Sequence, residues 1–450
     1  MSARVEPSVF AERRRRLMDA LGPDAIAVFS AAPERVRSND VEYRYRQHSD
    51  FYYLTGFPEP GALCVLQPGD AEHEYVLFVR PRDRERETWV GRRAGVEGAV
   101  SQYGASKAYP IQDVDRYLPK WIAAHDTFYC ALERELPFAR RAMEWLEEAQ
   151  QHRPRTGRGP TGLLDAREPV HEMRLRKAPI ELERMRQAAT ISAEAHCAAM
   201  REARAGCWEY EIEALIEYTF RRHGASAPAY PSIVAAGANA TVLHYTNNEC
   251  QLGEGELLLI DAGAEFGFYC ADITRTFPIG PRFAGRQRDI YSLVLAAQRA
   301  AIHEVRPGAP FDAPHRRAVR VLVEGLIALG LLSGDADDVE REELYKPLYM
   351  HRTSHWLGID VHDVGLYKLG DQVRTLEPGM VLTVEPGLYI ADHLEDIAPE
   401  WHGIGVRIED DVLVTSDGCE VLTAAVPKAL DDLEAIRRDA LGLSTAAISA

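Results

Sequence analysis

The stretch GELLLIDAGAEFGFYCADITRTFPIG, residues 255–280, contains two apolar strand segments that each carry an aspartate. The run LLLI is typical of a strand buried on both faces, and it ends at Asp261. A tight turn centred on Phe266 and Gly267 would join it to FYCADITRTF and place Asp261 directly opposite Asp272. Opposed positions hold their Cβ atoms about 4.5 to 5.5 Å apart. Two carboxylates placed this way require a cation or a shared proton.

The hairpin by itself leaves an alternative open. A register shifted by one residue would send one aspartate to the other face of the sheet. Both aspartates would then be ordinary strand-end or turn residues. The hairpin supports the two interpretations about equally, and three further segments favour a site.

Two more strand segments carry acidic residues. In MVLTVEPG, residues 380–387, Glu385 is the last residue before a proline, which cannot donate to a strand ladder. In GIGVRIEDDVLVT, residues 403–415, strand alternation puts Arg407 and Glu409 on the same face. Taken alone, this last pair is better interpreted as a surface salt bridge. Together with the aspartates, the glutamates suggest the rim of a site.

Histidines accompany these carboxylates. The segment SHWLGIDVHDVG, residues 354–365, contains His355 and His362, and TVLHYTNN contains His244. A lone histidine is usually a satisfied core or surface residue, but two in a glycine-broken apolar segment are harder to dismiss. Carboxylates with imidazoles and no thiolate favour Mn²⁺ and tolerate Co²⁺ or Zn²⁺. Four carboxylates can hold two divalent ions, an arrangement that suits hydrolysis at a carbonyl.

Composition limits the class of partner and the compartment. With 69 acidic and 52 basic residues the formal charge is −17, which disfavours nucleic-acid binding. No apolar run is long enough for a membrane span. Seven scattered cysteines without a CxxC pair indicate no disulfide framework, so a cytoplasmic location is expected. The basic run at residues 13–16 is interpreted as a solvated helix face rather than a targeting signal.

The chain divides into two parts by pattern. Short apolar runs alternate with charged, helix-like stretches up to about residue 150, which predicts an α/β domain. Residues 151–162 are dense in Pro, Gly and Arg and predict a surface linker. Helices and strands alternate again after Pro179. The prediction is a mixed α/β (α+β) chain with an amino-terminal domain at 1–173 and a catalytic domain at 174–440.

At these motifs the sequence resembles the pita-bread metallopeptidases of the aminopeptidase P type. The segments IDAGAEFGFYCADITRTFP, TSHWLGIDVHDVG, LTVEPGLYI and GVRIEDD match the family's motifs in order. The segment YRQHSDFYYLTGFPEPGALCVL resembles the amino-terminal domain of the bacterial members. The resemblance implies a pita-bread catalytic domain and a metal-dependent aminopeptidase. Its substrates would be peptides with an N-terminal Xaa-Pro, and the enzyme would release Xaa.

The resemblance also implies a dinuclear site. Asp261 and Asp272 would bind one ion, His355 and Glu385 the other, and Asp272 and Glu409 would bridge them. A hydroxide bridging the two ions would attack the Xaa carbonyl. Glu385 would accept its proton and pass it to the departing proline nitrogen.

Four further residues match family positions. His362 and His244 match two histidines that orient substrate carbonyls and stabilise the tetrahedral intermediate, and Arg407 matches an arginine that supports the site. Trp89 matches a tryptophan that reaches a substrate cleft, in some members that of a neighbouring subunit. A partly buried packing tryptophan is the alternative. By resemblance alone, a homo-oligomer, dimer or tetramer, is expected.

The competing interpretations share the fold. Prolidase has the same ligands but cleaves Xaa-Pro dipeptides, and the amino-terminal match and SHWLGIDVHDVG favour aminopeptidase P. For a methionine aminopeptidase the large amino-terminal domain would be surplus. A non-catalytic pita-bread protein that binds peptides, and the metal-independent creatinase, are disfavoured by the complete ligand set.

Overall fold

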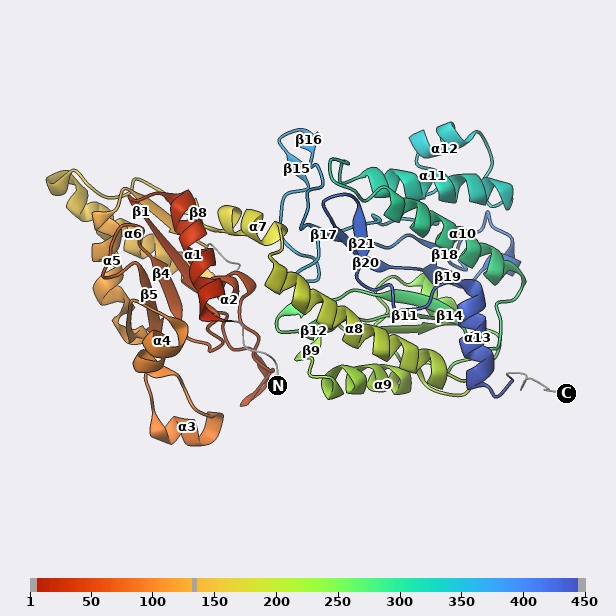
Figure 1. Ribbon diagram of the computed structural model, residues 1–450, viewed down its shortest axis with the longest axis horizontal. Coiled ribbons are helices and arrows are strands. Elements are labelled where there is room, and N and C mark those ends of the chain that lie inside the picture. The colour runs from red at the N-terminus through yellow and green to blue at the C-terminus, as the bar shows by residue number, and fades with distance from the viewer. Residues whose placement is uncertain (1–5, 132–135, 444–450) are drawn as a thin grey trace. The chain divides into compact units, whose positions relative to one another are not determined.

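The computed structural model describes residues 6–131 and 136–443 and divides into two compact units (Figure 1). The smaller unit ends at Met173 and the larger begins at Arg174. Each unit combines helices with β-sheet, so the predicted mixed α/β class is confirmed. None of the described helices is both long and apolar enough to cross a lipid bilayer.

The smaller unit is built on one mixed sheet of order β6-β5-β4-β1-β7-β8. β1 pairs antiparallel with β4 and parallel with β7. The strands of the smaller unit are β1 (Ala25–Ser30), β2 (Val36–Ser38), β3 (Val41–Glu42), β4 (Leu63–Leu66), β5 (Tyr75–Val79), β6 (Lys107–Pro110), β7 (Thr127–Cys130) and β8 (Leu163–Asp165). Its helices are α1 (Pro7–Leu21), α2 (Ser49–Thr55), α3 (Arg84–Val90), α4 (Gly95–Tyr103), α5 (Val114–Ala124) and α6 (Leu136–Thr156), and α7 (Arg167–Leu175) follows. The central strands are buried and pack against α5 and α6.

The basic run of α1 is only half solvated. Arg15 and Arg16 are exposed as predicted, but Arg13 and Arg14 are buried. Each buried guanidinium donates to a backbone carbonyl of α2 and lies within 4 Å of a tyrosine ring centroid. Aromatic faces and carbonyl oxygens satisfy a guanidinium away from water. The prediction of a solvated face was therefore wrong for Arg13 and Arg14.

The predicted linker lies inside the smaller unit. Helix α6 continues to Thr156, and residues 157–162 lead into β8, which pairs in parallel with β7. The stretch is largely exposed, as its composition suggested. It connects two elements of one sheet domain because β8 finds its partner more than thirty residues back along the chain.

The larger unit contains two successive halves, each with a helix pair followed by strands. The first half comprises α8 (Pro179–Glu202), α9 (Glu209–Arg222), β9 (Ala227–Pro228), β10 (Ile233–Ala236), β11 (Leu257–Asp261), β12 (Ala264–Phe266), β13 (Tyr269–Cys270) and β14 (Thr274–Pro278). The second comprises α10 (Gly285–His303), α11 (Ala313–Ala328), α12 (Ala336–Arg341), β15 (Lys368–Leu369), β16 (Gln372–Val373), β17 (Val381–Val384), β18 (Gly387–Ile390), β19 (Ile404–Arg407), β20 (Asp410–Val414) and β21 (Cys419–Val421), closed by α13 (Leu430–Ala440). This alternation of helices and strands after Pro179 agrees with the predicted pattern.

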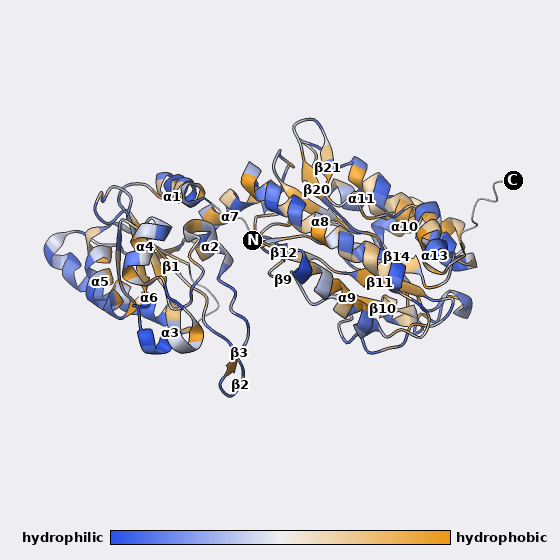
Figure 2. Ribbon diagram, turned by 60° about the horizontal axis from the view of Figure 1, so that its bottom comes forward, coloured by the Kyte–Doolittle hydropathy of each residue, from blue (hydrophilic) through white to orange (hydrophobic). Residues whose placement is uncertain are grey.

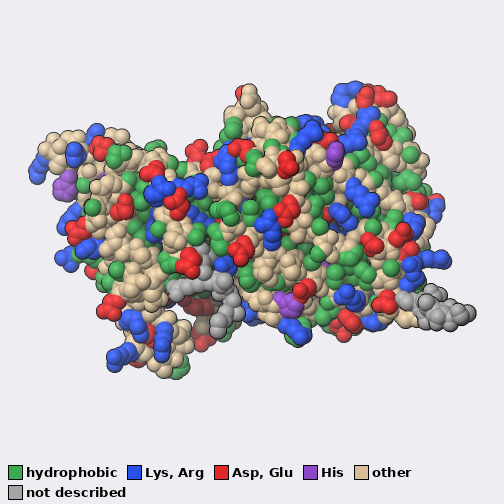
Figure 3. All heavy atoms as spheres, in the orientation of Figure 1, with side chains coloured by type: hydrophobic (Ala, Val, Ile, Leu, Met, Phe, Trp, Pro, Cys, Tyr) green, Lys and Arg blue, Asp and Glu red, His purple; other side chains and the backbone are tan. Residues whose placement is uncertain are grey.

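These helices and strands share one core. Figure 2 shows hydrophobic strands β11 and β14 and a helix α8 on which hydrophilic and hydrophobic residues alternate. α8 buries Ile191, Ala195 and Ala199, and the core continues through α9, α10, α11 and the strands of both halves. On the face seen in Figure 3, acidic and basic side chains are interspersed over the surface. The excess negative charge therefore does not gather into one patch on that face.

The decisive hairpin has a different register from the predicted one. Asp261 lies opposite Thr274, and Glu265 lies opposite Cys270. The turn is centred one residue later, on Gly267 and Phe268, which both have positive φ as a type I′ turn requires. The prediction that Asp261 directly opposes Asp272 was therefore wrong. Because side chains alternate with period two, Asp272 still shares the face of Thr274, so both aspartates face the same side.

Gly263 marks the tightest point of this hairpin. A Cβ on Gly263 would lie 1.7 Å from the carbonyl oxygen of Ala271 on the facing strand. We expect Gly263→Ala to destabilise the larger unit by about 3 kcal/mol, because the strands would have to separate beside Asp272. Thermal unfolding monitored by calorimetry measures the effect. Gly280→Ala is the matched control, since no heavy atom lies within 4 Å of its added Cβ; equal effects would contradict the expectation.

Candidate active site

One cavity of about 660 Å³ in the larger unit brings together all the residues that the sequence proposed as metal ligands or catalytic groups, and Trp89 is not among its lining residues. Its lining includes Asp261, Asp272, His355, Glu385, Glu409, His244, His362 and Arg407. Both halves of the unit contribute to it. The fold thereby brings together residues up to 165 positions apart in the sequence, from His244 to Glu409.

The four carboxylates lie where strands are interrupted. Asp261 is the last residue of β11, and Asp272 lies between β13 and β14. Glu385 separates β17 from β18, and Glu409 separates β19 from β20. At such a break the regular ladder ends, so the backbone can turn and direct a polar side chain out of the sheet. The prediction of an acidic strand end is confirmed for Asp261 and Glu385, whereas Asp272 and Glu409, predicted within strands, lie at breaks between strands.

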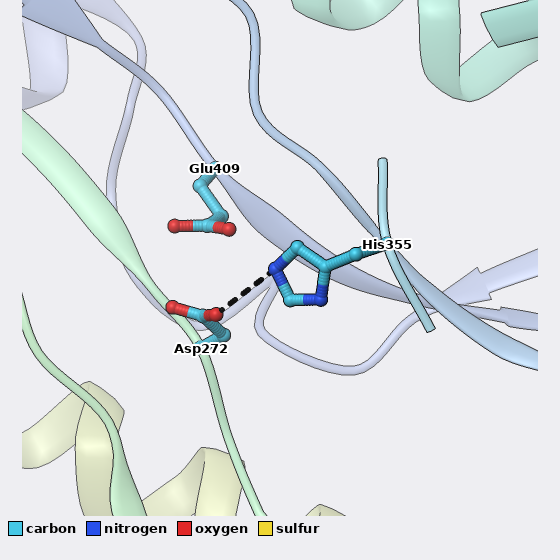
Figure 4. A group of neighbouring side chains, drawn as sticks. All are labelled: Asp272, His355 and Glu409. Atoms are coloured by element: carbon cyan, nitrogen blue, oxygen red, sulfur yellow. Dashed lines mark ion pairs between the residues drawn. The ribbon is translucent and has the colours of Figure 1, made fainter. Parts of the chain in front are cut away.

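Asp272, His355 and Glu409 form the centre of the cluster, and their side chains point toward one another (Figure 4). One ligand atom from each lies within 4.8 Å of the others. His355 Nε2 is 3.4 Å from Asp272 Oδ2 and 3.6 Å from Glu385 Oε1. His355 Nδ1 lies 3.0 Å from the carbonyl oxygen of Trp356 and donates to it. This bond fixes the ring so that Nε2 faces the carboxylates, as a metal-binding imidazole requires.

Arg407 joins the two sides of the cluster. It is buried, and its Nη2 donates to Asp261 Oδ2 at 2.5 Å. Its Nε donates to Thr274 Oγ1, which in turn donates to Glu409 Oε2 at 2.7 Å. The interpretation as a surface salt bridge between Arg407 and Glu409 was wrong. Strand alternation placed both on one face correctly, but only the tertiary structure supplied Asp261 and Thr274 as their partners.

Tyr230 was missed by the sequence reasoning. Its hydroxyl lies 2.6 Å from Asp261 Oδ1 and 2.5 Å from Asp272 Oδ1. A phenol has one proton and can satisfy only one of two carboxylates at a time. Its surroundings in the sequence, APAYPS, carry no periodic or motif signal. It reaches the cluster because β10 pairs with β11 and brings the preceding loop to Asp261.

His351 was also missed, although it precedes His355 by four residues. Its Nε2 lies 2.8 Å from the hydroxyl of Tyr389, which accepts from Arg407 Nη1 at 3.0 Å. Its Nδ1 is 3.7 Å from Glu385 Oε2. Burial lowers the pKa of His351 to about 3, so the ring is neutral. The signal that could have found it is its position three residues before the segment that contains His355 and His362.

Burial disfavours the charged forms of the carboxylates in the cluster. Burial raises the pKa of Glu385 to about 7, against the lowering effect of His355 and Arg407. Burial, then the charge of Asp272, raise the pKa of Glu409 well above its usual range. Burial disfavours the charged form of Asp272, but its hydrogen bond to His355 lowers its pKa below the usual value. Buried carboxylates that resist ionisation together are the setting in which divalent cations can replace protons.

The donor set fits divalent ions. Four carboxylates and one imidazole converge in a cavity, and hard oxygen donors dominate. The imidazole is held by a backbone carbonyl, and Asp272 by Asp411, whose carboxylate accepts from the Asp272 N–H. Such supporting bonds orient ligands in metal sites.

Comparisons with known proteins agree along nearly the whole chain. Residues 183–416 match the model for metallopeptidase family M24, and residues 10–129 match the aminopeptidase P, N-terminal domain. The Xaa-Pro aminopeptidase of Escherichia coli is 44% identical over 429 residues, covering 95% of this chain and 97% of the relative. The chain belongs to the Xaa-Pro aminopeptidases of metallopeptidase family M24.

Solved structures of Xaa-Pro aminopeptidases share the fold. The structure of Pseudomonas aeruginosa aminopeptidase PepP is 50% identical, with a TM-score of 0.95 over 98% of this chain and 100% of that chain. Aminopeptidase P from Escherichia coli with the inhibitor Pro-Leu is 43% identical, with a TM-score of 0.93 over 98% and 100%. The predicted family, fold and Xaa-Pro aminopeptidase activity, a hydrolase reaction, are confirmed. Prolidase, methionine aminopeptidase, creatinase and a non-catalytic peptide-binding protein are set aside.

The remaining predicted residues of this Xaa-Pro aminopeptidase lie at accessible positions. His244 and His362 are exposed on the wall of the cavity, and the rings of His362 and His355 meet edge to face at 4.4 Å. Trp89 lies on α3 in the smaller unit and is 84% exposed. Its interpretation as a packing tryptophan was wrong for the single chain, since no residue of α3 is buried.

Proposed function

We propose that this Xaa-Pro aminopeptidase works with two divalent ions, held by the five donors of the cavity. Asp261, Asp272, His355, Glu385 and Glu409 would hold the ions. The observation that carries the proposal is the convergence of these side chains in one cavity. Mn²⁺ suits this oxygen-rich set best, and Co²⁺ or Zn²⁺ could replace it.

Bound ions would supply an activated water and a Lewis acid that polarises the scissile carbonyl. The other tasks fall to the chain itself. Glu385 would accept a proton and pass it to the proline nitrogen, a role suited to a carboxyl that lines the cavity 3.6 Å from His355. His362 and His244, on the cavity wall, would donate to substrate carbonyls and to the developing oxyanion. Arg407 would hold Asp261 in place through their ion pair.

We propose peptides of three or more residues with an N-terminal Xaa-Pro as the substrates. A peptide bond to proline lacks an N–H, and the ring fixes φ, so recognition as an ordinary extended strand is lost. A site that acts on the carbonyl avoids that dependence. The Escherichia coli relative takes the inhibitor Pro-Leu, a proline followed by another residue. The cavity, at about 660 Å³, has room for a residue beyond the proline.

We further propose a homo-oligomer in the cytoplasm. The exposed Trp89 on α3 is the feature that a neighbouring subunit would cover. No disulfide joins Cys64, Cys197, Cys207, Cys250 or Cys419, as a reducing compartment requires. Sedimentation velocity of the purified chain measures the oligomeric state directly.

A comparison of peptides of two lengths tests the proposed substrate class. With Mn²⁺ added, we expect Ala-Pro-Ala to release free alanine at least about tenfold faster than Ala-Pro, because the longer peptide fills more of the cavity. Ala-Gly-Ala is the control for the proline requirement. Faster cleavage of Ala-Pro would contradict the proposal, as would equal cleavage of Ala-Gly-Ala. Repeating the assay with Co²⁺ and Zn²⁺ ranks the metals.

A further inference from the structure

The segment that carries His355 and His362 forms no helix or long strand. Residues 354–365 are held by a few isolated bonds, among them Asp363 N–H to the Trp356 carbonyl at 2.9 Å. The carbonyl of Gly358 accepts from the N–H of Cys270 at 2.8 Å. Only its first residues pair with a strand, through the bridge between Trp356 and Leu382, so the rest of the loop relies on side chains for its position. One such anchor is the side chain of Asp363.

Asp363 is locked into a buried ion cluster. Its Oδ1 accepts from Arg174 Nη2 at 2.5 Å, and its Oδ2 accepts from Lys177 Nζ at 3.0 Å. The side chains of Asp363 and Lys177 are each 1% exposed and that of Arg174 is 2% exposed. Arg174 Nη2 also donates to Asp360 Oδ2 at 2.7 Å. Both cations come from the start of the larger unit, far from the loop in sequence.

The space around this cluster is tight. A Cβ on Gly358 would lie 2.1 Å from Asp363 Oδ2 and 2.9 Å from Lys177 Cε. The glycine therefore lets the loop backbone pass directly over the ion cluster. Burying three charges costs desolvation energy that an apolar contact would not. The three buried charges are accounted for if they hold the loop in one geometry.

The ring of His362 has no comparable anchor of its own. Among the described residues nothing forms a hydrogen bond with it, and its ring contact is with His355. Its place on the cavity wall therefore follows from its backbone. That backbone is covalently joined to Asp363, whose side chain is fixed on the side away from solvent.

We infer that Asp363, clamped by Arg174 and Lys177, is a positioning residue that sets His362 toward the substrate. The inference rests on the role proposed above for His362. Asp363 touches no substrate in this account and acts only through its neighbour. Displacing a catalytic group by about 1 Å can cost about a hundredfold in rate.

The test is a double-mutant cycle on kcat with Ala-Pro-Ala and Mn²⁺. We expect Asp363→Asn to lower kcat by about a hundredfold in the native chain, with KM changed by less than about threefold. In the His362→Ala background the same substitution is expected to cost less than about threefold, because the residue it positions is gone. In the His244→Ala background it should keep its full effect. Lys177→Met, which leaves Arg174 paired with Asp363, should give a smaller loss of the same kind.

The outcomes separate the inference from its premise. If His362→Ala alone keeps native kcat, the proposed role of His362 fails and the inference with it. If His362→Ala is impaired and Asp363→Asn costs the same in both backgrounds, the inference alone is overturned. Loss of Mn²⁺ binding in Asp363→Asn, measured by calorimetric titration, would also overturn it, since the effect would then pass through His355. Should Asp363→Asn fail to fold, the same cycle with Lys177→Met decides.

Discussion

Asp272→Asn is expected to abolish measurable hydrolysis of Ala-Pro-Ala, a loss of at least about a thousandfold. Asp272 faces His355 Nε2 at 3.4 Å, accepts from Tyr230 and shares the cluster with Glu409. Each of the two proposed ions needs its carboxylate. An amide keeps the shape of the side chain but supplies a neutral oxygen and removes one negative charge. Bound Mn²⁺ should fall from two ions per chain to one or fewer, measured by elemental analysis after dialysis.

Asp432→Asn provides the control for this substitution. Asp432 is exposed on α13, so the change removes the same charge away from the cavity. It should leave both kcat and the metal content unchanged. Native activity in Asp272→Asn, or a native Mn²⁺ content without activity, would contradict the proposed dinuclear site in distinguishable ways. The first would exclude Asp272 as a ligand, and the second would limit its role to catalysis.

Removal of metal by a chelator is expected to stop turnover and to make thermal stability depend on pH. Burial raises the pKa of Glu385 from 4.5 to about 7, so the folded chain binds an extra proton between these values. Stability from this group is lost as pH rises through that window. The pKa of His355 is raised from 6.5 to about 9: burial opposes the charge, but the hydrogen bond to Asp272 outweighs it. Its contribution is present below pH 6.5 and lost as pH approaches 9.

Both groups therefore act in the same direction. The melting temperature of the metal-free chain should fall between about pH 7 and pH 9, above the range in which the lowered pKa of His351 has the opposite effect. Saturating Mn²⁺ should restore activity and flatten this dependence, because the ions hold the carboxylates ionised and occupy His355. At a hundredfold excess over the dissociation constant, each ion contributes about 2.7 kcal/mol. Differential scanning calorimetry with and without chelator measures both curves.

Asp272→Asn again supplies the comparison. In that variant added Mn²⁺ should raise the melting temperature much less than in the native chain. A metal-free melting temperature that rises with pH would show that the buried cluster does not carry the expected protons. An equal stabilisation by Mn²⁺ in both proteins would place the ions elsewhere.

The hairpin illustrates how far pattern alone could go. The apolar run before Asp261 and the period of a strand were enough to predict that two carboxylates meet on one face. The predicted turn position was wrong because Phe268 adopts a positive φ, a conformation that a phenylalanine in the sequence does not indicate. The error was two positions on one strand, so the parity survived and the shared face with it. Short-range periodicity is robust to such shifts, whereas the exact opposed pair is not.

The sequence could not predict contacts between residues of distant segments. Nothing in APAYPS marks Tyr230 as the hydroxyl between two aspartates, and Arg13 and Arg14 looked like solvated charges until α2 covered them. The sequence analysis paired Arg407 with Glu409, the nearest acidic residue in the sequence. In the structure Arg407 pairs with Asp261, which is 146 residues away, because β11 and β19 lie against each other.

The sequence by itself determined which residues could be proposed for a site, four carboxylates and three histidines, and that the strands before Asp261 and Glu385 end at acidic residues. These features are local, written in apolar runs, proline stops and the alternation of side chains. The tertiary structure decided the register of the hairpin, the partners of Arg407 and the ion cluster at Asp363. The hairpin register follows from the positive φ of Gly267 and Phe268 in the turn. The partners of Arg407 and of Asp363 depend on which surfaces pack together, through contacts that join residues over a hundred positions apart.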